Sequence, residues 1–291
     1  MHTDVRDRPE AHAPAKQDVR LSVARELATT GMVWRRELIR YRRARTRVIT
    51  GLMQPILYLF VLGYGLTPLV GETAGFDFKK FVFPGVVAMS VVTTSIFSAI
   101  SIVWDREFGF LREMLVAPVS RVALVVGKAL GGATVSTIQG AIMLALAPLV
   151  GVRLTPTVVI AVFAISMLMA FSMTCFGVFF ASRLKKIENF QVVMQFLLLP
   201  MLFLSGALFP PTGLPSWLMF LTRINPLTYA VDPLKRVVYA AQDIPDAALE
   251  RFDPPLEVFG YAVPSWLSLS IVMMFGVAFL ALSIRSFGKD E

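Results

Sequence analysis

Six long apolar stretches, each almost free of charged side chains, constrain the fold of this 291-residue chain more than any other feature. Apolar residues make up 56% of the sequence and charged residues only 16%. A helix needs about 20 residues to cross a hydrocarbon layer about 30 Å thick, and no strand-like alternation indicates a barrel. The sequence therefore predicts an all-α polytopic membrane protein with transmembrane helices at 48–68, 82–104, 122–150, 157–181, 190–210 and 264–284. The third stretch is longer than one span needs, which indicates tilt or a start at the membrane surface.

The placement of lysine and arginine predicts the orientation of these spans. Segments assigned to the cytoplasm carry twenty of these residues, and segments assigned to the outside carry seven. Such an excess marks the cytoplasmic side of a membrane protein, and no apolar core with a cleavage site precedes the first span. We therefore expect a multi-pass protein with both termini in the cytoplasm. The net charge of +8 then reflects topology, and nucleic acid is not expected as a partner.

The 47 residues before the first span divide into two parts. Residues 1–16 are rich in Pro, Ala and charge, so we expect a disordered tail. Residues 17–47 predict an interfacial helix, with apolar side chains in the headgroup layer and arginines on anionic phosphates, leading into a six-span domain at 48–291. The alternative is a solvated basic flank that only sets topology. The apolar stripe comprises Val19, Val23, Leu27, Val33, Trp34, Leu38, Ile39 and Tyr41, and the arginines are Arg35, Arg36, Arg40, Arg42, Arg43, Arg45 and Arg47.

The sequence offers no motif for a metal or a nucleotide. Cys175 lies alone in the fourth span, and the two histidines lie in the tail, so we expect neither a metal nor a cofactor on this chain. Gly127-Lys128 lacks the upstream glycine and the following hydroxyl of a phosphate-binding loop. Lys128 is the one charged residue within the six stretches, and we expect it to snorkel to the inner surface. Because ion-driven carriers usually need a buried ionisable group, energy for transport is expected from a separate protein, with a secondary carrier as an alternative.

The segment 105–121, DREFGFLREMLVAPVSR, lies between the second and third spans and has the pattern of an amphipathic helix that ends at Pro118. Phe108, Leu111 and Leu115 follow helical spacing on one face. We expect this face to dock into a groove on a soluble partner, while charged residues on the other face fix the register through exposed ion pairs. The alternative is a helix that floats at the membrane surface. The charged residues are Arg106, Glu107, Arg112 and Glu113.

This segment, followed by GKALGG at 127–132, resembles the coupling-helix region of type-2 ABC exporter permeases, especially the daunorubicin-resistance-like multidrug subgroup. A second motif, FLSGALFPPTGLPSWLMFLTRINPLTYAVDPLKR at 203–236, resembles the same family in order and placement. The resemblance implies a six-helix membrane subunit that pairs with a second permease, identical or not, and with two ATP-binding subunits that hold ATP and Mg²⁺. It also implies that residues of the segment couple to the ATPase, and for Gly109 it favours close packing over a mid-helix weak point. The coupling residues are Arg106, Glu107, Phe108, Gly109, Phe110, Leu111, Arg112, Glu113, Leu115 and Pro118.

The second motif is expected to break the fifth span at Ser205-Gly206 and Pro210-Pro211 and then to form two short helices separated by Asn225-Pro226. These pieces are apolar but too short to cross a bilayer, so they indicate re-entrant helices buried at the outer leaflet. An amphipathic loop anchored by Trp217 and Trp266 is the alternative. The family resemblance implies a cap over the exit, formed by Gly206, Pro210, Pro215, Trp217, Asn225 and Pro226.

The family plan also implies a substrate pathway lined by the second and fifth spans. Aromatic, methionine, amide and hydroxyl side chains suit an amphipathic or lipid-like cargo, although such residues in membrane helices are often packing residues. The pathway candidates are Thr93, Thr94, Phe97, Ser98, Gln191, Gln195, Phe196 and Met201. We expect the permease subunit of an ATP-driven exporter of hydrophobic drugs, lipids or amphipathic metabolites. Export of a lipid-linked glycan and a non-transporting membrane anchor remain as alternatives.

Overall fold

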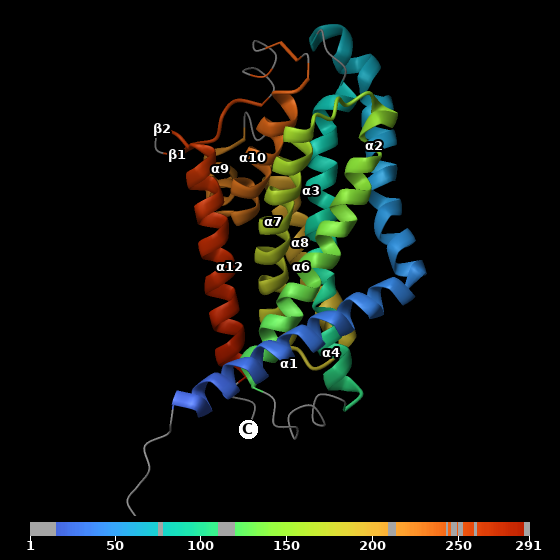
Figure 1. Cartoon of the computed structure of the whole chain (residues 1–291). Helices are drawn as coiled ribbons and strands as arrows, with labels where there is room; N and C mark the ends of the chain where they lie inside the picture. The colour runs from blue at the N-terminus through green and yellow to red at the C-terminus, as the bar shows by residue number, and fades with distance from the viewer. Residues whose placement is uncertain are drawn as a thin grey trace, which may run out of the picture.

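The computed structural model describes residues 16–74, 78–109, 120–208, 214–242, 244–245, 249, 253–258 and 261–287. Six of its helices are long and apolar enough to cross a membrane, which confirms the all-α polytopic class. They stand side by side in Figure 1. The spans are α2 (Arg45–Ala74), α3 with α4 (Phe78–Ser98 and Ile100–Glu107), α6 (Arg121–Ala145), α7 (Pro156–Arg183), α8 (Ile187–Leu204) and α12 (Ser265–Phe287).

The structure gives a local reason for the apparent length of the third stretch. Helix α6 ends at Ala145, and a 3-10 turn, η1 (Ala147–Val150), follows at Pro148. Gly151 then adopts φ 74°, a left-handed conformation that side chains other than glycine rarely adopt. The last residues of the apolar run therefore cap the span, and the helix itself is of ordinary length.

Helix α3 lies at the centre of the bundle, where α2, α6, α7 and α10 pack around it. Its residues from Phe81 to Val92 are all buried. Small residues permit close contacts between the helices; a Cβ on Gly177 of α7 would lie 2.7 Å from the Ile96 carbonyl oxygen. Helices α2, α8 and α12 are mostly exposed in this single chain, so their outer faces are available to lipid or to another subunit.

Two short helices and a hairpin lie at one end of the bundle (Figure 1). They are α9 (Ser216–Ile224), α10 (Pro226–Tyr239) and the antiparallel pair β1 (Glu257–Val258) and β2 (Tyr261–Ala262). Asn225 ends α9, and its side chain accepts a hydrogen bond from the Leu227 amide at the start of α10. Its Nδ2 atom also donates to the Met201 carbonyl at 2.7 Å, which ties the two short helices to the end of α8. The predicted pair of short helices is therefore confirmed.

The N-terminal helix α1 (Lys16–Arg43) runs across the opposite end of the bundle (Figure 1). The end of α12 lies at this same end, where the Arg121 side chain donates to the Phe287 carbonyl. The sequence predicted one helix as far as residue 47, but α1 stops at Arg43 and α2 begins at Arg45. The helical turn breaks at Ala44, which lets the chain change direction before it enters the bundle. The predicted disordered tail lies outside the described residues, except for Lys16.

Candidate functional site

Helix α1 packs directly on the first half of α6, and glycines permit this close contact. A Cβ on Gly127 would lie 2.8 Å from Val33 Cβ, and a Cβ on Gly131 would lie 2.7 Å from Glu37 Cβ. The two glycines are four residues apart and therefore share one face of α6. The GKALGG motif thus provides a flat surface for α1. Trp34 and Tyr41 of α1 extend this contact by hydrogen bonds to Thr134 and Gln139.

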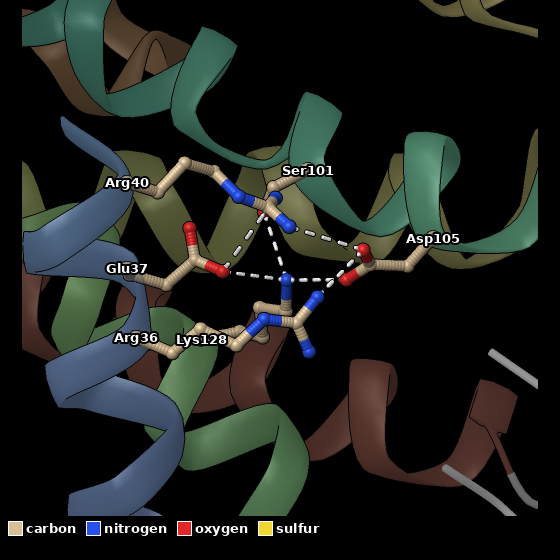
Figure 2. A network of polar contacts seen from close by, with 6 residues as sticks. All are labelled: Arg36, Glu37, Arg40, Ser101, Asp105 and Lys128. Atoms are coloured by element: carbon tan, nitrogen blue, oxygen red, sulfur yellow. Dashed lines mark hydrogen bonds and ion pairs between the residues drawn. The ribbon is translucent and has the colours of Figure 1, made fainter. Parts of the chain in front are cut away.

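Five charged residues from three helices meet where α1 crosses α4 and α6 (Figure 2). We call this group, comprising Arg36, Glu37, Arg40, Asp105 and Lys128, the ion cluster. Lys128 Nζ lies 2.6 Å from Glu37 Oε1, 2.8 Å from Asp105 Oδ2 and 3.0 Å from Ser101 Oγ. Asp105 Oδ1 also accepts from Arg36 at 2.9 Å and from Arg40 at 3.2 Å. The cluster joins α1 to the cytoplasm-assigned ends of the second and third spans.

The structure corrects the prediction for Lys128, which does not reach the surface. Its side chain is only 3% exposed. An ammonium group has three N–H donors, and each of them has a partner here. Because a buried charge is tolerated only when it is paired and hydrogen-bonded, Glu37 and Asp105 are what keep Lys128 in the apolar interior.

The sequence analysis missed this cluster as a site. Glu37 and Lys128 are 91 residues apart, and Asp105 and Lys128 are 23 apart, so no local spacing links them. The available signal was a lone lysine inside an apolar run, together with Glu37 in the basic segment before the first span and Asp105 directly after the second apolar stretch. A lone intramembrane charge implies a partner.

The start of segment 105–121 differs from the prediction. Asp105, Arg106 and Glu107 form the last turn of α4 and therefore belong to the second span. Gly109 then adopts φ +82°, and no atom of the described residues lies within 4 Å of the position of a Cβ there. Gly109 is thus a helix-ending residue that needs the left-handed conformation, and neither a mid-helix position nor close packing against α1 is observed.

Two coupling candidates join α4 to the junction between α7 and α8. The Ile187 amide donates to Glu107 Oε2 at 2.9 Å, and Arg106 donates to the Leu184 carbonyl at 3.4 Å. Phe108 is 59% exposed, and its ring lies 5.1 Å from that of Trp104. The other coupling candidates lie outside the described residues: Phe110, Leu111, Arg112, Glu113, Leu115 and Pro118.

Most of the predicted pathway residues border two cavities, one between α3 and α8 and one where α3 meets α1, α2 and α6. One cavity of about 800 Å³ is bordered by Phe97, Gln191, Gln195 and Phe196. A smaller one of about 210 Å³ is bordered by Thr93, Thr94 and Phe97. These six residues are therefore brought together around Phe97.

The remaining two pathway candidates have other surroundings. Ser98 donates to the Ser95 carbonyl at 2.7 Å, and it lies against Gly132 of α6. The Met201 carbonyl accepts the bond from Asn225. Both residues therefore have packing contacts inside this chain.

The outer cap candidates lie around the end of α8 and the two short helices. Gly206 adopts φ 76°, and a Cβ on Gly85 of α3 would overlap the Ala207 carbonyl, so the turn after α8 packs tightly on the bundle. Pro215 precedes α9, Trp217 is 65% exposed, and Pro226 begins α10. Pro210 lies outside the described residues.

Helix α10 carries buried charge at this end of the bundle. Burial raises the pKa of Asp232 above its usual range, although Arg236 at 2.9 Å opposes the shift. Burial, the negative charge of Asp253 and a hydrogen bond with it raise the pKa of Tyr239 well above its usual value. The Tyr239 hydroxyl donates to the Phe81 carbonyl at 2.9 Å, which holds α10 against the start of α3. Within the described residues, no group of three or more His, Cys, Asp or Glu side chains could hold a metal ion.

Comparisons with known proteins cover most of the chain. The ABC-2 type transporter family matches residues 29–239, a range that contains both sequence motifs. The putative transport permease ycf38 of Cyanophora paradoxa is 31% identical over 205 residues, which cover 69% of this chain and 71% of the relative. Nodulation protein J of Rhizobium leguminosarum bv. trifolii is 28% identical over 71% of this chain and 79% of its own length. The inner membrane transport permease YadH of Escherichia coli K12 is 24% identical over 73% of this chain and 84% of its own length.

Proposed function

The chain belongs to the ABC-2 type transporter family, and from this premise we propose that it is the permease subunit of an exporter that moves hydrophobic drugs, lipids or amphipathic metabolites outward. Membership implies association with ABC ATP-binding subunits, and the relatives are named as transport permeases. In this proposal two such subunits bind ATP and Mg²⁺, and a second permease completes the membrane pathway.

The observation that carries the proposal is the lining of the cavity between α3 and α8. Phe97, Val192, Phe196 and Leu199 provide an apolar wall, and Gln191 and Gln195 provide amides without fixed charge. Such a surface binds an amphipathic cargo by burial of apolar area, while the amides satisfy polar groups of varied geometry. Phe196 is 76% exposed in the single chain, so this wall is open toward lipid or toward a second subunit.

The contacts at the end of α4 suggest how force reaches this cavity. Segment 105–121 continues directly from α4, and Glu107 is hydrogen-bonded to the first residue of α8, Ile187. A push on the segment would therefore act on both walls of the cavity together. Closure of the ATP-binding subunits on ATP would supply that push and change which side of the membrane the cavity faces.

The ion cluster has a supporting role in this mechanism. It fixes α1 to α4 and α6 through buried, hydrogen-bonded charges, so the three helices resist independent movement. The relative YadH is named as an inner membrane transport permease. We propose the same setting here, in a bacterial cytoplasmic membrane with both termini on the inner side.

Inverted membrane vesicles provide the test. The chain would be co-expressed with its ATP-binding subunit, and uptake of a fluorescent hydrophobic dye would be followed after ATP addition. Export predicts uptake that needs ATP and disappears when the partner's phosphate-loop lysine is replaced. Uptake that persists without the partner and follows an ion gradient would contradict the proposal and indicate a secondary carrier.

A further inference from the structure

A second large cavity lies beside the ion cluster, and its chemistry differs from that of the cavity described above. It has a volume of about 800 Å³, and Arg36 and Arg40 border it on the α1 side. Phe97, Trp104 and Phe108 border it on the side of the second span. We call it the basic cavity, and we call the cavity with Gln195 and Phe196 the apolar cavity.

Among the described residues that border the basic cavity, Arg36 and Arg40 are opposed by one carboxylate, that of Asp105. In the ion cluster, three cations face two carboxylates, and Lys128 is enclosed by its partners. The two arginines remain partly accessible, because their side chains are 42% and 35% exposed. A guanidinium presents five N–H donors in a planar fork, which suits a phosphate or carboxylate. An anion in this cavity would meet two arginines that Asp105 already holds in place.

The two cavities share part of their lining. Both are bordered by Phe97 and Gln191. Beyond these residues the lining becomes apolar, with Val192, Phe196 and Leu199. The basic end lies at the same end of the bundle as α1, and the apolar end lies further along α8, toward the middle of the span. Together the two cavities therefore match the polarity of a lipid-like molecule, because one could hold a charged headgroup and the other an apolar tail.

We infer that the basic and apolar cavities together bind an amphiphile with an anionic, phosphate-bearing headgroup, with the head on Arg36 and Arg40 and the tail between α3 and α8. Given the export function proposed above, anionic amphiphiles of the inner leaflet are the cargo class. Uncharged and cationic compounds would offer no anionic group to Arg36 and Arg40.

Trp104 reports directly on this site, because it borders the basic cavity and is 49% exposed. The chain has four tryptophans, and Trp34, Trp217 and Trp266 would be replaced by Phe to leave one fluorophore. The protein would be placed in two preparations of phosphatidylcholine vesicles. One contains brominated phosphatidylglycerol, and the other contains the same fraction of brominated phosphatidylcholine. Bromine quenches tryptophan only on close contact. Stronger quenching by the anionic lipid is expected.

Two double variants separate specific binding from general attraction to a basic surface. Arg36→Gln with Arg40→Gln removes the charges that border the basic cavity. Arg35→Gln with Arg42→Gln removes the same charge from exposed positions on the same helix. The first pair should lower the relative affinity for the anionic lipid about tenfold, as expected for the loss of charge-assisted hydrogen bonds, and the control pair should preserve it.

Equal quenching by the two lipids in the starting protein would overturn the inference without any variant. Equal loss of preference in both double variants would also overturn it, because attraction would then be general. The assay needs neither ATP nor the ATP-binding subunit. A failed lipid preference together with intact ATP-driven dye export would therefore refute only the cargo class. An intact lipid preference together with dye uptake that persists without the ATP-binding subunit would refute only the export function.

Discussion

Replacement of Lys128 by methionine tests the ion cluster, because methionine keeps the length of the side chain but removes its charge. The variant loses all three Lys128 bonds. Asp105 keeps both arginines, whereas Glu37 keeps only Arg40 at 3.9 Å. Removal of one partner from a buried pair costs about 3–5 kcal/mol. Since only Glu37 loses most of its compensation, we expect the lower end, about 3 kcal/mol, or roughly 10 °C in melting temperature.

The assay is thermal unfolding in mild detergent, followed by the loss of monodisperse protein on size exclusion. Lys185→Met is the matched control, because Lys185 is exposed in the loop before α8, and its melting temperature should not change. The double variant Glu37→Gln with Lys128→Met should lose less stability than the sum of the single variants, with a coupling energy of about 1–3 kcal/mol. Additive effects, or a Lys128→Met protein as stable as the control, would refute the reasoning.

Three further predictions concern other parts of the molecule. Gly127→Ala should destabilise the protein by about 1–3 kcal/mol because its Cβ meets α1. Gly31→Ala should not, because no atom in the described part of the chain lies within 4 Å of its Cβ; the same melting assay measures both. Burial raises the pKa of Asp232, so the folded protein binds a proton at a higher pH than the unfolded chain does, and stability should grow as the pH falls through that raised pKa toward the ordinary one. The melting temperature of the wild type should therefore rise relative to that of Asp232→Asn on acidification. Parallel pH profiles of the two proteins would contradict this. Glu113→Arg and Leu115→Asp should leave membrane insertion intact but uncouple ATP hydrolysis from transport, and normal transport by both variants would contradict a coupling role for segment 105–121.

The positions of the spans could be predicted because they depend on local composition. A span is a run of apolar residues, and the predicted start of the first one at residue 48 coincides with that of the span Val48–Gly65. The short helices α9 and α10 were also predictable, because Asn225-Pro226 is a local signal that ends one helix and begins the next. These features need no knowledge of which helices touch.

The ion cluster and the start of segment 105–121 could not be predicted in the same way. Lys128 was expected at the surface, since a lysine near a helix end can usually reach water; its burial depends on Glu37, which a different helix supplies. The alternative of a mid-helix position for Gly109 was wrong, because its backbone angle places it after the end of α4, and close packing against a partner protein stays a prediction. Both differences come from tertiary contacts and chain direction, which composition does not encode.

The most direct test of the account is to purify the tagged chain from its host in mild detergent and to identify by mass spectrometry the proteins that accompany it. We expect an ATP-binding protein with a phosphate-binding loop in stoichiometric amount, because the chain is a permease of the ABC-2 family. A chain that purifies alone, and that still moves cargo along an ion gradient after reconstitution, would contradict it.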